Sequence, residues 1–205
     1  MNALRGLTTL RVVRKGIEHM KITLLASYQK QFAYYRHLGE KAMAQLSDEE
    51  LFRDDAAGSN SVAVIVKHLS GNMKSRWTDF LTTDGEKPWR NRDQEFIAGF
   101  SNRAELETAW AEGWAVLEVA VNGLQPEQLS TIVYIRNEGH MVAEALNRQL
   151  AHYAHHVGQI VLLGKQHRGT DWQPLSIPKG DSAKYNAGKF AEEKGVRNFI
   201  DGLMK

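Results

Sequence analysis

The chain has no cysteine among its 205 residues. Disulfide bonds, a cysteine nucleophile and thiolate metal ligands are therefore excluded, and a transition-metal site must use histidine, aspartate or glutamate. Apolar runs are short, and none approaches the roughly 20 residues that a membrane-spanning helix needs. Nothing marks the chain for secretion, so we expect a protein of the reducing cytoplasm that contacts no membrane.

Proline is scarce, and its four copies fall outside the long periodic segments. Because proline interrupts helices, this distribution favours a mostly helical protein whose prolines lie in the connections between helices. An excess of charge of one sign is also missing, since 26 basic residues stand against 24 acidic ones and the formal net charge is +2. This balance gives no support for a nucleic-acid partner.

Four long segments carry apolar residues at the three- and four-residue spacing of amphipathic helices. They cover about residues 21–46, 61–81, 103–121 and 140–167. Ser47 with Glu50, and Asn102 with Glu105, have the spacing of helix capping boxes. The β-branched residues 131–135 predict an extended segment or a hairpin. The length fits one domain, and we predict an all-α fold.

The connection between the second and third segments is long. Neighbouring antiparallel helices normally need about 2–8 connecting residues, so the extra length predicts a crossover along the helices. Most of residues 82–96 are polar or charged, which is typical of a solvated loop. Trp89 and Phe96 interrupt this pattern and predict that the loop is anchored on the body of the protein.

Both ends of the chain differ from the predicted helical domain at residues 21–168. Residues 1–20 form a basic extension, which either adds a helical turn or two or precedes a natural start at Met20. We slightly prefer the second interpretation. Residues 169–205 predict an extended tail, with a short helix within residues 190–203 that packs on the domain. Exposed aromatic side chains in the tail and the crossover would be covered in a homodimer.

Three histidines lie within five residues of the fourth segment: His152, His155 and His156. At about 100° per residue, His152 and His156 lie one turn apart on the inward side of the helix, whereas His155 is turned away. Two imidazoles on one helix face can present their ring nitrogens to a single metal ion. The alternative, a hydrogen-bonded pair of core histidines, is at least as common for an isolated pattern of this kind.

A second row of polar residues follows the edge of the apolar face of the second segment. It consists of His68, Asn72 and Arg76, spaced by four residues. A buried polar group without a partner costs about 1–3 kcal/mol, so these side chains need partners. A lone histidine in such a place is more often a satisfied core residue than a ligand. The three polar side chains together instead predict a lined cavity.

In combination, these motifs resemble those of the DinB-like superfamily. The resemblance covers about residues 21–168 and rests on His68-Leu69 and on His152-xxx-His156-Val-Gly-Gln159. A closer similarity to an uncharacterised subgroup is carried by Lys67-His68-Leu69-Ser70-Gly71-Asn72-Met73, Arg76-Trp77, Asp84-Gly85-Glu86-Lys87 and Leu175-Ser176-Ile177-Pro178. The spacing is specific in combination, whereas either histidine motif alone is a weak signal.

The resemblance implies an up-down-down-up four-helix bundle that binds one divalent metal ion through three histidines. Carried over to this chain, the ligands are His68, His152 and His156. Zinc is the first expectation for an all-histidine site, with nickel or iron as alternatives. Characterised relatives include transferases and isomerases that use low-molecular-weight thiols. The implied partners are therefore a small-molecule substrate and such a thiol.

Four further residues are candidates for the chemistry around the metal. Asn72 and Arg76 would line the cavity wall, where Arg76 could hold a carboxylate through its two-pronged donor geometry. Gln159 has a carbonyl oxygen that can accept the second N–H of a ligating histidine. Arg148 lies one turn before His152 and, because it has no acceptor, could serve only the substrate.

Three functions remain open. The first is a thiol S-transferase, in which a metal-bound thiolate attacks an electrophile. The second is metal-assisted hydrolysis, which needs a carboxylate as general base. The visible candidate, Glu144, lies two turns from His152, and this distance weakens the second function. The third is a structural or interaction protein whose metal ties two helices together, which a closed four-ligand site would favour.

Overall fold

The computed structural model describes residues 2–54, 58–97 and 99–203, and only the backbone for residues 2–14 and 22. Most of this part is helical. The long helices are α1 (Asn2–Met43), α3 (Val62–Trp77), α4 (Arg103–Asn122) and α5 (Val142–Arg168). Shorter elements are α2 (Asp48–Phe52), α6 (Ser182–Phe190), β1 (Ile132–Ile135), β2 (Glu138–Met141) and the 3-10 turns η1 (Asp93–Phe96), η2 (Pro126–Ser130), η3 (Gly169–Asp171) and η4 (Phe199–Gly202). None of the described helices combines the length and apolar content of a membrane span.

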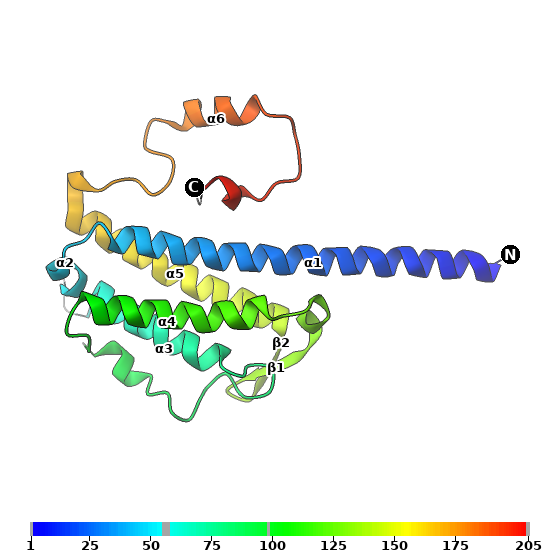
Figure 1. Cartoon of the computed structure of the whole chain (residues 1–205), viewed down its shortest axis with the longest axis horizontal. Coiled ribbons are helices and arrows are strands. Elements are labelled where there is room, and N and C mark those ends of the chain that lie inside the picture. Colours follow the sequence, from blue (N-terminus) through cyan, green and yellow to red (C-terminus); the bar gives the residue numbers. More distant parts are fainter. Residues whose placement is uncertain (1, 55–57, 98, 204–205) are drawn as a thin grey trace.

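The four long helices lie side by side, and the first half of α1 extends beyond the other three (Figure 1). The first helix is therefore longer than predicted, because it begins at Asn2 and includes most of the basic extension. No proline interrupts this part of the chain, so the helix continues through it. The side chains of the first 14 residues lie outside the described part, and the natural start at Met20 stays a prediction.

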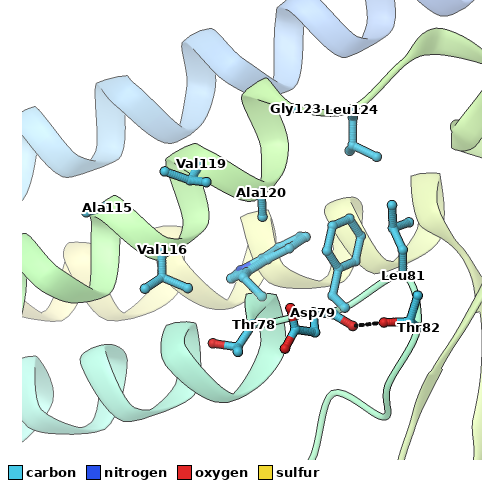
Figure 2. Close-up of a pocket in the computed structure, with 12 residues that line it drawn as sticks. Thr78, Asp79, Leu81, Thr82, Ala115, Val116, Val119, Ala120, Gly123 and Leu124 are labelled. Carbon is cyan, nitrogen blue, oxygen red and sulfur yellow. Dashed lines mark hydrogen bonds between the residues drawn. The ribbon is translucent and has the colours of Figure 1, made fainter.

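Helix α3 ends at Trp77, about one turn earlier than predicted. Thr78 has an extended backbone, and Asp79 has a φ of 48°, in the left-handed region that a helix cannot continue through. This end of α3 and the second half of α4 border an open groove of about 660 Å³ (Figure 2). The groove is mostly apolar, and Asp79 is its one titratable lining residue.

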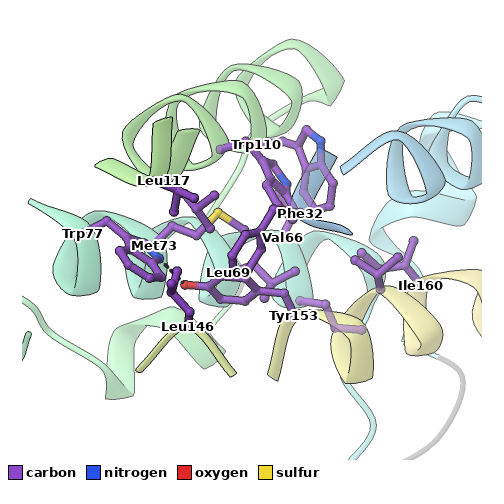
Figure 3. Close-up of a cluster of buried hydrophobic side chains, with 14 of the residues drawn as sticks. Phe32, Val66, Leu69, Met73, Trp77, Trp110, Leu117, Leu146, Tyr153 and Ile160 are labelled. Carbon is purple, nitrogen blue, oxygen red and sulfur yellow. Dashed lines mark hydrogen bonds between the residues drawn. The ribbon is translucent and has the colours of Figure 1, made fainter. Parts of the chain in front are cut away.

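Aromatic and aliphatic side chains together fill the core between the long helices (Figure 3). Phe32 of α1 lies with its ring centroid 6.2 Å from that of Trp77 and 6.0 Å from that of Tyr153 of α5. Trp114 of α4 lies 5.8 Å from Tyr153, whose side chain is fully buried. Each such ring buries about 150–250 Å² and prefers tilted or edge contacts. Tyr153 therefore fixes the position of α5 along its own axis and its rotation about that axis, next to His152.

Both predicted helix caps are present, and the first is complete. The Ser47 hydroxyl accepts from the Glu50 backbone N–H at 3.2 Å, and the Glu50 carboxylate accepts from the Ser47 backbone N–H at 2.7 Å. Asn102 accepts from the Glu105 backbone N–H at 3.0 Å. The Glu105 carboxylate, however, accepts from the Ser101 backbone N–H at 2.8 Å. The Asn102 cap is thus confirmed. The reciprocal hydrogen bond of the predicted box differs, because Glu105 accepts from the backbone N–H of Ser101 and not from that of Asn102.

The predicted extended segment forms an antiparallel hairpin, in which Ile135 pairs with Glu138. Arg136 and Asn137 between them have φ angles of 57° and 63°, as the common two-residue hairpin turn requires. Asp84 of the crossover accepts from the backbone N–H groups of both turn residues, each at 2.8 Å. It also accepts from the Glu86 backbone N–H at 2.7 Å. The crossover is therefore fastened to the hairpin that leads into α5.

Asp84 should make stability depend on pH at the acid end. Burial raises the pKa of its carboxyl, but the three backbone N–H groups outweigh this and lower the pKa below its usual value. The folded pKa lies below the unfolded pKa, so the stabilisation is present above about pH 4 and is lost as pH falls further. We expect Asp84→Asn to lower the free energy of unfolding at pH 7 by about 1–2 kcal/mol in urea unfolding.

The difference between Asp84→Asn and wild type should shrink between pH 7 and pH 2.5, because the wild-type carboxyl becomes increasingly protonated as the pH falls. Asp171→Asn is the matched control, since its side chain is 74% exposed. An equal difference at both pH values would show that the charge of Asp84 does not contribute.

The tail differs from its prediction. Its α-helix is α6, whereas residues 191–198 lie outside any helix and only η4 forms beyond them. Val196 is fully exposed, and Ile200 is 2% exposed. The side chain of Asn198 accepts from the Ile200 backbone N–H at 3.0 Å, which begins η4 at the next residue. The short helix predicted within residues 190–203 corresponds to the 3-10 turn η4 alone, and α6 before it was not predicted.

Candidate metal centre

Three histidine rings from two helices meet at one point. His68 of α3 and His152 and His156 of α5 each offer a ring nitrogen, and these atoms all lie within 4.8 Å of one another. His68 Nε2 lies 3.2 Å from His152 Nε2, and the ring centroids of His152 and His156 are 4.7 Å apart. His155 is exposed. Within α5, the helical spacing thus turns His152 and His156 inward and His155 outward.

Two of the rings are oriented by oxygen acceptors. His68 Nδ1 lies 2.9 Å from Glu95 Oε2, and His156 Nδ1 lies 2.7 Å from Gln159 Oε1. Since these oxygens accept, the Nδ1 atoms carry the protons and each Nε2 keeps its lone pair. His68 Nε2 and His152 Nε2, which are 3.2 Å apart, can share one proton as a hydrogen bond or can bind one cation. The donor set therefore fits a bound metal ion.

Glu95 of η1 joins the crossover to the metal centre. It is 6% exposed, and its carboxylate accepts from Arg90 Nε at 2.7 Å and Arg90 Nη2 at 2.9 Å. Burial raises the pKa of the Glu95 carboxyl, but hydrogen bonds from His68 and Arg90 outweigh this and lower the pKa below its usual value. A Cβ at Gly71 of α3 would clash with Glu95 Oε1. Glycine at this position therefore allows the Glu95 carboxylate to pack directly against the backbone of α3.

The two histidines of α5 are held in the neutral form. Burial lowers the pKa of His152 to about 3, with further lowering from the neighbouring histidines and arginines. Burial also lowers the pKa of His156 to about 4, against an opposing contribution from its hydrogen bond to Gln159. Both rings are therefore uncharged at neutral pH, and neutral imidazole is the form that binds metal ions.

The three histidines open onto a cavity of about 400 Å³. Its other lining residues are Asn72, Arg76, Arg90, Arg92, Phe96, Arg136, Arg148 and Gln149. Phe96 stacks on His68 with ring centroids 4.8 Å apart, whereas Trp89 is 59% exposed. Phe96 therefore anchors the crossover as predicted, and the same prediction for Trp89 is wrong. The larger groove in Figure 2 has no histidine among its lining residues, so a metal ion held by histidines would lie at the smaller cavity.

The four predicted candidates around the metal lie in different settings. Asn72, Arg76 and Arg148 line the cavity, and Gln159 contacts His156 from behind the ring. Arg76 Nη1 donates to the Gly85 carbonyl and lies 3.1 Å from Glu86 Oε2. The carboxylate that Arg76 holds in the structure is therefore a residue of the crossover.

Asn72 is part of a buried hydrogen-bond chain. Its Oδ1 accepts from the Tyr153 hydroxyl at 3.1 Å, and the same hydroxyl accepts from Trp77 Nε1 at 3.0 Å. Tyr153→Phe would leave both neighbours without this partner inside the core, so we expect the free energy of unfolding to fall by about 1–3 kcal/mol. Chemical unfolding measures this change. Tyr134→Phe is the matched control, because Tyr134 is 54% exposed, and equal losses in the two variants would contradict the role of the chain.

The sequence patterns do not reveal Glu95, the arginines of the crossover and hairpin, or Gln149 as residues of this site. The crossover has no helical or strand periodicity, so spacing alone does not place Glu95 near His68. A glycine in the interior of α3 was the available signal. Glycine inside a helix costs about 1 kcal/mol relative to alanine, which indicates that something packs closely there.

Comparison with known proteins identifies a family for this chain. A family model described as "Protein of unknown function (DUF1572)" matches residues 20–181. No curated protein and no solved structure matches the chain significantly. The match covers most of the chain, including all three histidines and the crossover. The chain therefore belongs to the DUF1572 family of proteins of unknown function.

Proposed function

We propose that this protein is a metal-dependent enzyme that transfers a low-molecular-weight thiol to an electrophile at the three-histidine centre. The observation that carries the proposal is the meeting of three neutral or oriented imidazoles at the wall of a 400 Å³ cavity. Structural zinc sites are normally closed by four protein ligands. In the described part of the chain, no fourth histidine, aspartate or glutamate joins the group. An open position facing a cavity favours catalysis.

We also propose that the domain at residues 21–168 is an up-down-down-up four-helix bundle of the DinB-like superfamily. Two observations support this proposal. Helix α3 packs most extensively on α4, and α1 packs on α5. The long connection from Thr78 to Asn102 has no α-helix in its described residues and is of a length that suits parallel neighbours. The same superfamily is the source of the thiol-transfer proposal.

The chain's own residues would have distinct roles at this centre. His68, His152 and His156 would hold the metal, with zinc as the first expectation and nickel or iron as alternatives. A bound divalent ion supplies a Lewis acid that lowers the pKa of a coordinated thiol or water. Glu95 and Gln159 keep the ring protons on Nδ1, which leaves the other nitrogen free.

The carboxylates around the cavity favour thiol transfer over hydrolysis. Hydrolysis needs a free general base, but Glu95 is bound by His68 and Arg90 and its pKa is lowered. Glu144 is exposed, and its carboxylate accepts from the Met141 backbone N–H at 2.8 Å at the start of α5. A thiol brings its own nucleophile and needs no such base once it is deprotonated.

Metal analysis and a thiol panel test this proposal. Untagged protein, never exposed to chelator or to nickel resin, should contain about one metal ion per chain. The loaded protein should consume a model electrophile only when a thiol such as N-acetylcysteine or glutathione is present. Turnover without thiol would support the hydrolase alternative. Stoichiometric metal in a closed site without turnover would support a structural role, and absence of metal would overturn both enzyme proposals.

A further inference from the structure

Arginine dominates the polar wall of the histidine cavity. Five arginines line it: Arg76, Arg90, Arg92, Arg136 and Arg148. No aspartate or glutamate is among its lining residues. A cavity of this size falls within the range of small-molecule sites, which is about 300–1,000 Å³. The composition of the wall therefore indicates the charge of the molecule that it binds.

Three of the five arginines are already paired with carboxylates. Arg90 is bound by Glu95 at 2.7 Å, and Arg76 lies 3.1 Å from Glu86. Arg136 also lies 3.1 Å from Glu86, so three arginines share two carboxylates. These ion pairs largely neutralise the three arginines, and they connect the crossover to α3 and to the hairpin.

The outer arginines, Arg92 and Arg148, are different. Both are exposed, and within the described ranges no carboxylate lies within ion-pair distance of either. The Arg92 guanidinium lies 4.9 Å from the centroid of the Phe96 ring, and Arg148 Nη1 lies 3.2 Å from His140 Nε2. Neither neighbour neutralises a positive charge. The rim of the cavity therefore carries two unneutralised guanidinium groups, and a divalent ion at the histidines would add to this positive field.

The wall also holds a donor and an acceptor without partners. Arg76 Nε and Gln149 Oε1 are buried and have no hydrogen-bond partner, and both residues line the cavity. A buried polar atom left in this state destabilises the fold. A polar group of a ligand would satisfy these atoms, as would one water in an adjoining space of about 10 Å³.

We infer that the cavity binds a small anionic molecule whose carboxylate or phosphate group is held by Arg92 and Arg148 while another part of it faces the three histidines. Guanidinium groups suit both anions because their planar donors match two oxygens at once. This inference deepens the proposed function and rests on it for the thiol, since the co-substrate would then be a thiol that carries a carboxylate.

A pair of thiols that differ only in charge tests the inference. Cobalt-loaded protein is titrated with N-acetylcysteine and with its uncharged methyl ester, and the thiolate-to-cobalt absorption band reports binding at the metal. We expect the acid to bind up to about a hundredfold more tightly than the ester, because two arginines hold its carboxylate. Arg92→Gln and Arg148→Gln should each weaken the acid about tenfold, as expected for one lost charge-assisted hydrogen bond, and leave the ester unchanged. Arg148→Lys should recover part of the loss.

Arg197→Gln is the matched control, because it removes an exposed guanidinium of the tail that pairs with Glu192. Circular dichroism confirms that each variant is folded. Equal binding of acid and ester in all variants would overturn the inference and leave the proposed function standing. If neither thiol produces the band, the proposed function fails. Calorimetry of the metal-free protein with succinate and with inorganic phosphate then tests anion binding directly: heat that Arg148→Gln removes supports it, and no heat overturns it.

Discussion

Replacing His152 with alanine should eliminate stoichiometric metal binding and all metal-dependent turnover. Its Nε2 lies 3.2 Å from that of His68, so the variant removes one of the three converging nitrogens. Zinc sites with four ligands bind with about 10–16 kcal/mol, so one ligand contributes on the order of 3 kcal/mol. This corresponds to an affinity loss of at least about a hundredfold. Competition with a chromophoric chelator measures it.

His155→Ala is the matched control for this experiment. His155 lies in the same turn of α5, but its side chain is exposed. The His155→Ala variant should bind metal as tightly as the wild type does. Both variants should show a cooperative thermal unfolding transition when metal is absent. Similar losses of affinity in the two variants would show that the inward pair of histidines is not the site.

Replacing Glu95 with glutamine should weaken both the metal centre and the fold. Partners behind metal ligands typically contribute 10–100-fold in affinity, and Glu95 Oε2 is the acceptor for His68 Nδ1. The side chain of Arg90 is 2% exposed, so the variant leaves a buried guanidinium without its closest negative partner. Breaking such a pair costs about 3–5 kcal/mol, and the remaining contact of Arg90 with Glu86 at 3.5 Å places the expected loss at the lower end.

The two effects of Glu95→Gln can be separated. Adding Arg90→Met removes the unpaired charge, so the double variant should regain much of the stability but not the metal affinity. Asp93→Asn, in the same 3-10 turn but exposed, is the matched control and should change neither. A double variant that regains metal affinity together with stability would show that Glu95 acts through the fold alone.

The helical parts of the site could be predicted from the sequence because they depend on local geometry. A period of 3.6 residues orients His152 and His156 inward and His155 outward, whatever α5 packs against. The same period places Asn72 and Arg76 on the cavity side of α3. Hydrogen bonding at helix starts is equally local, and the caps at Ser47 and Asn102 follow from two-residue patterns.

The crossover could not be predicted in this way. Glu95 meets His68 across 27 residues, and the contact depends on how an aperiodic segment folds back over α3. Arg136 reaches the cavity only because the hairpin turn adopts positive φ angles and Asp84 holds that turn. The end of α3 depends on Asp79 in the left-handed region, which no simple spacing indicates. Non-local packing therefore decides which charged side chains surround the metal centre.

X-ray absorption spectroscopy of the zinc-loaded protein tests the central claim most directly. We predict three histidine nitrogens at about 2.0–2.1 Å and one further ligand that is not from the protein. Addition of N-acetylcysteine should replace that ligand by sulfur at about 2.3 Å. Failure of the protein to bind zinc, or a shell of four protein ligands that the thiol does not alter, would contradict the account.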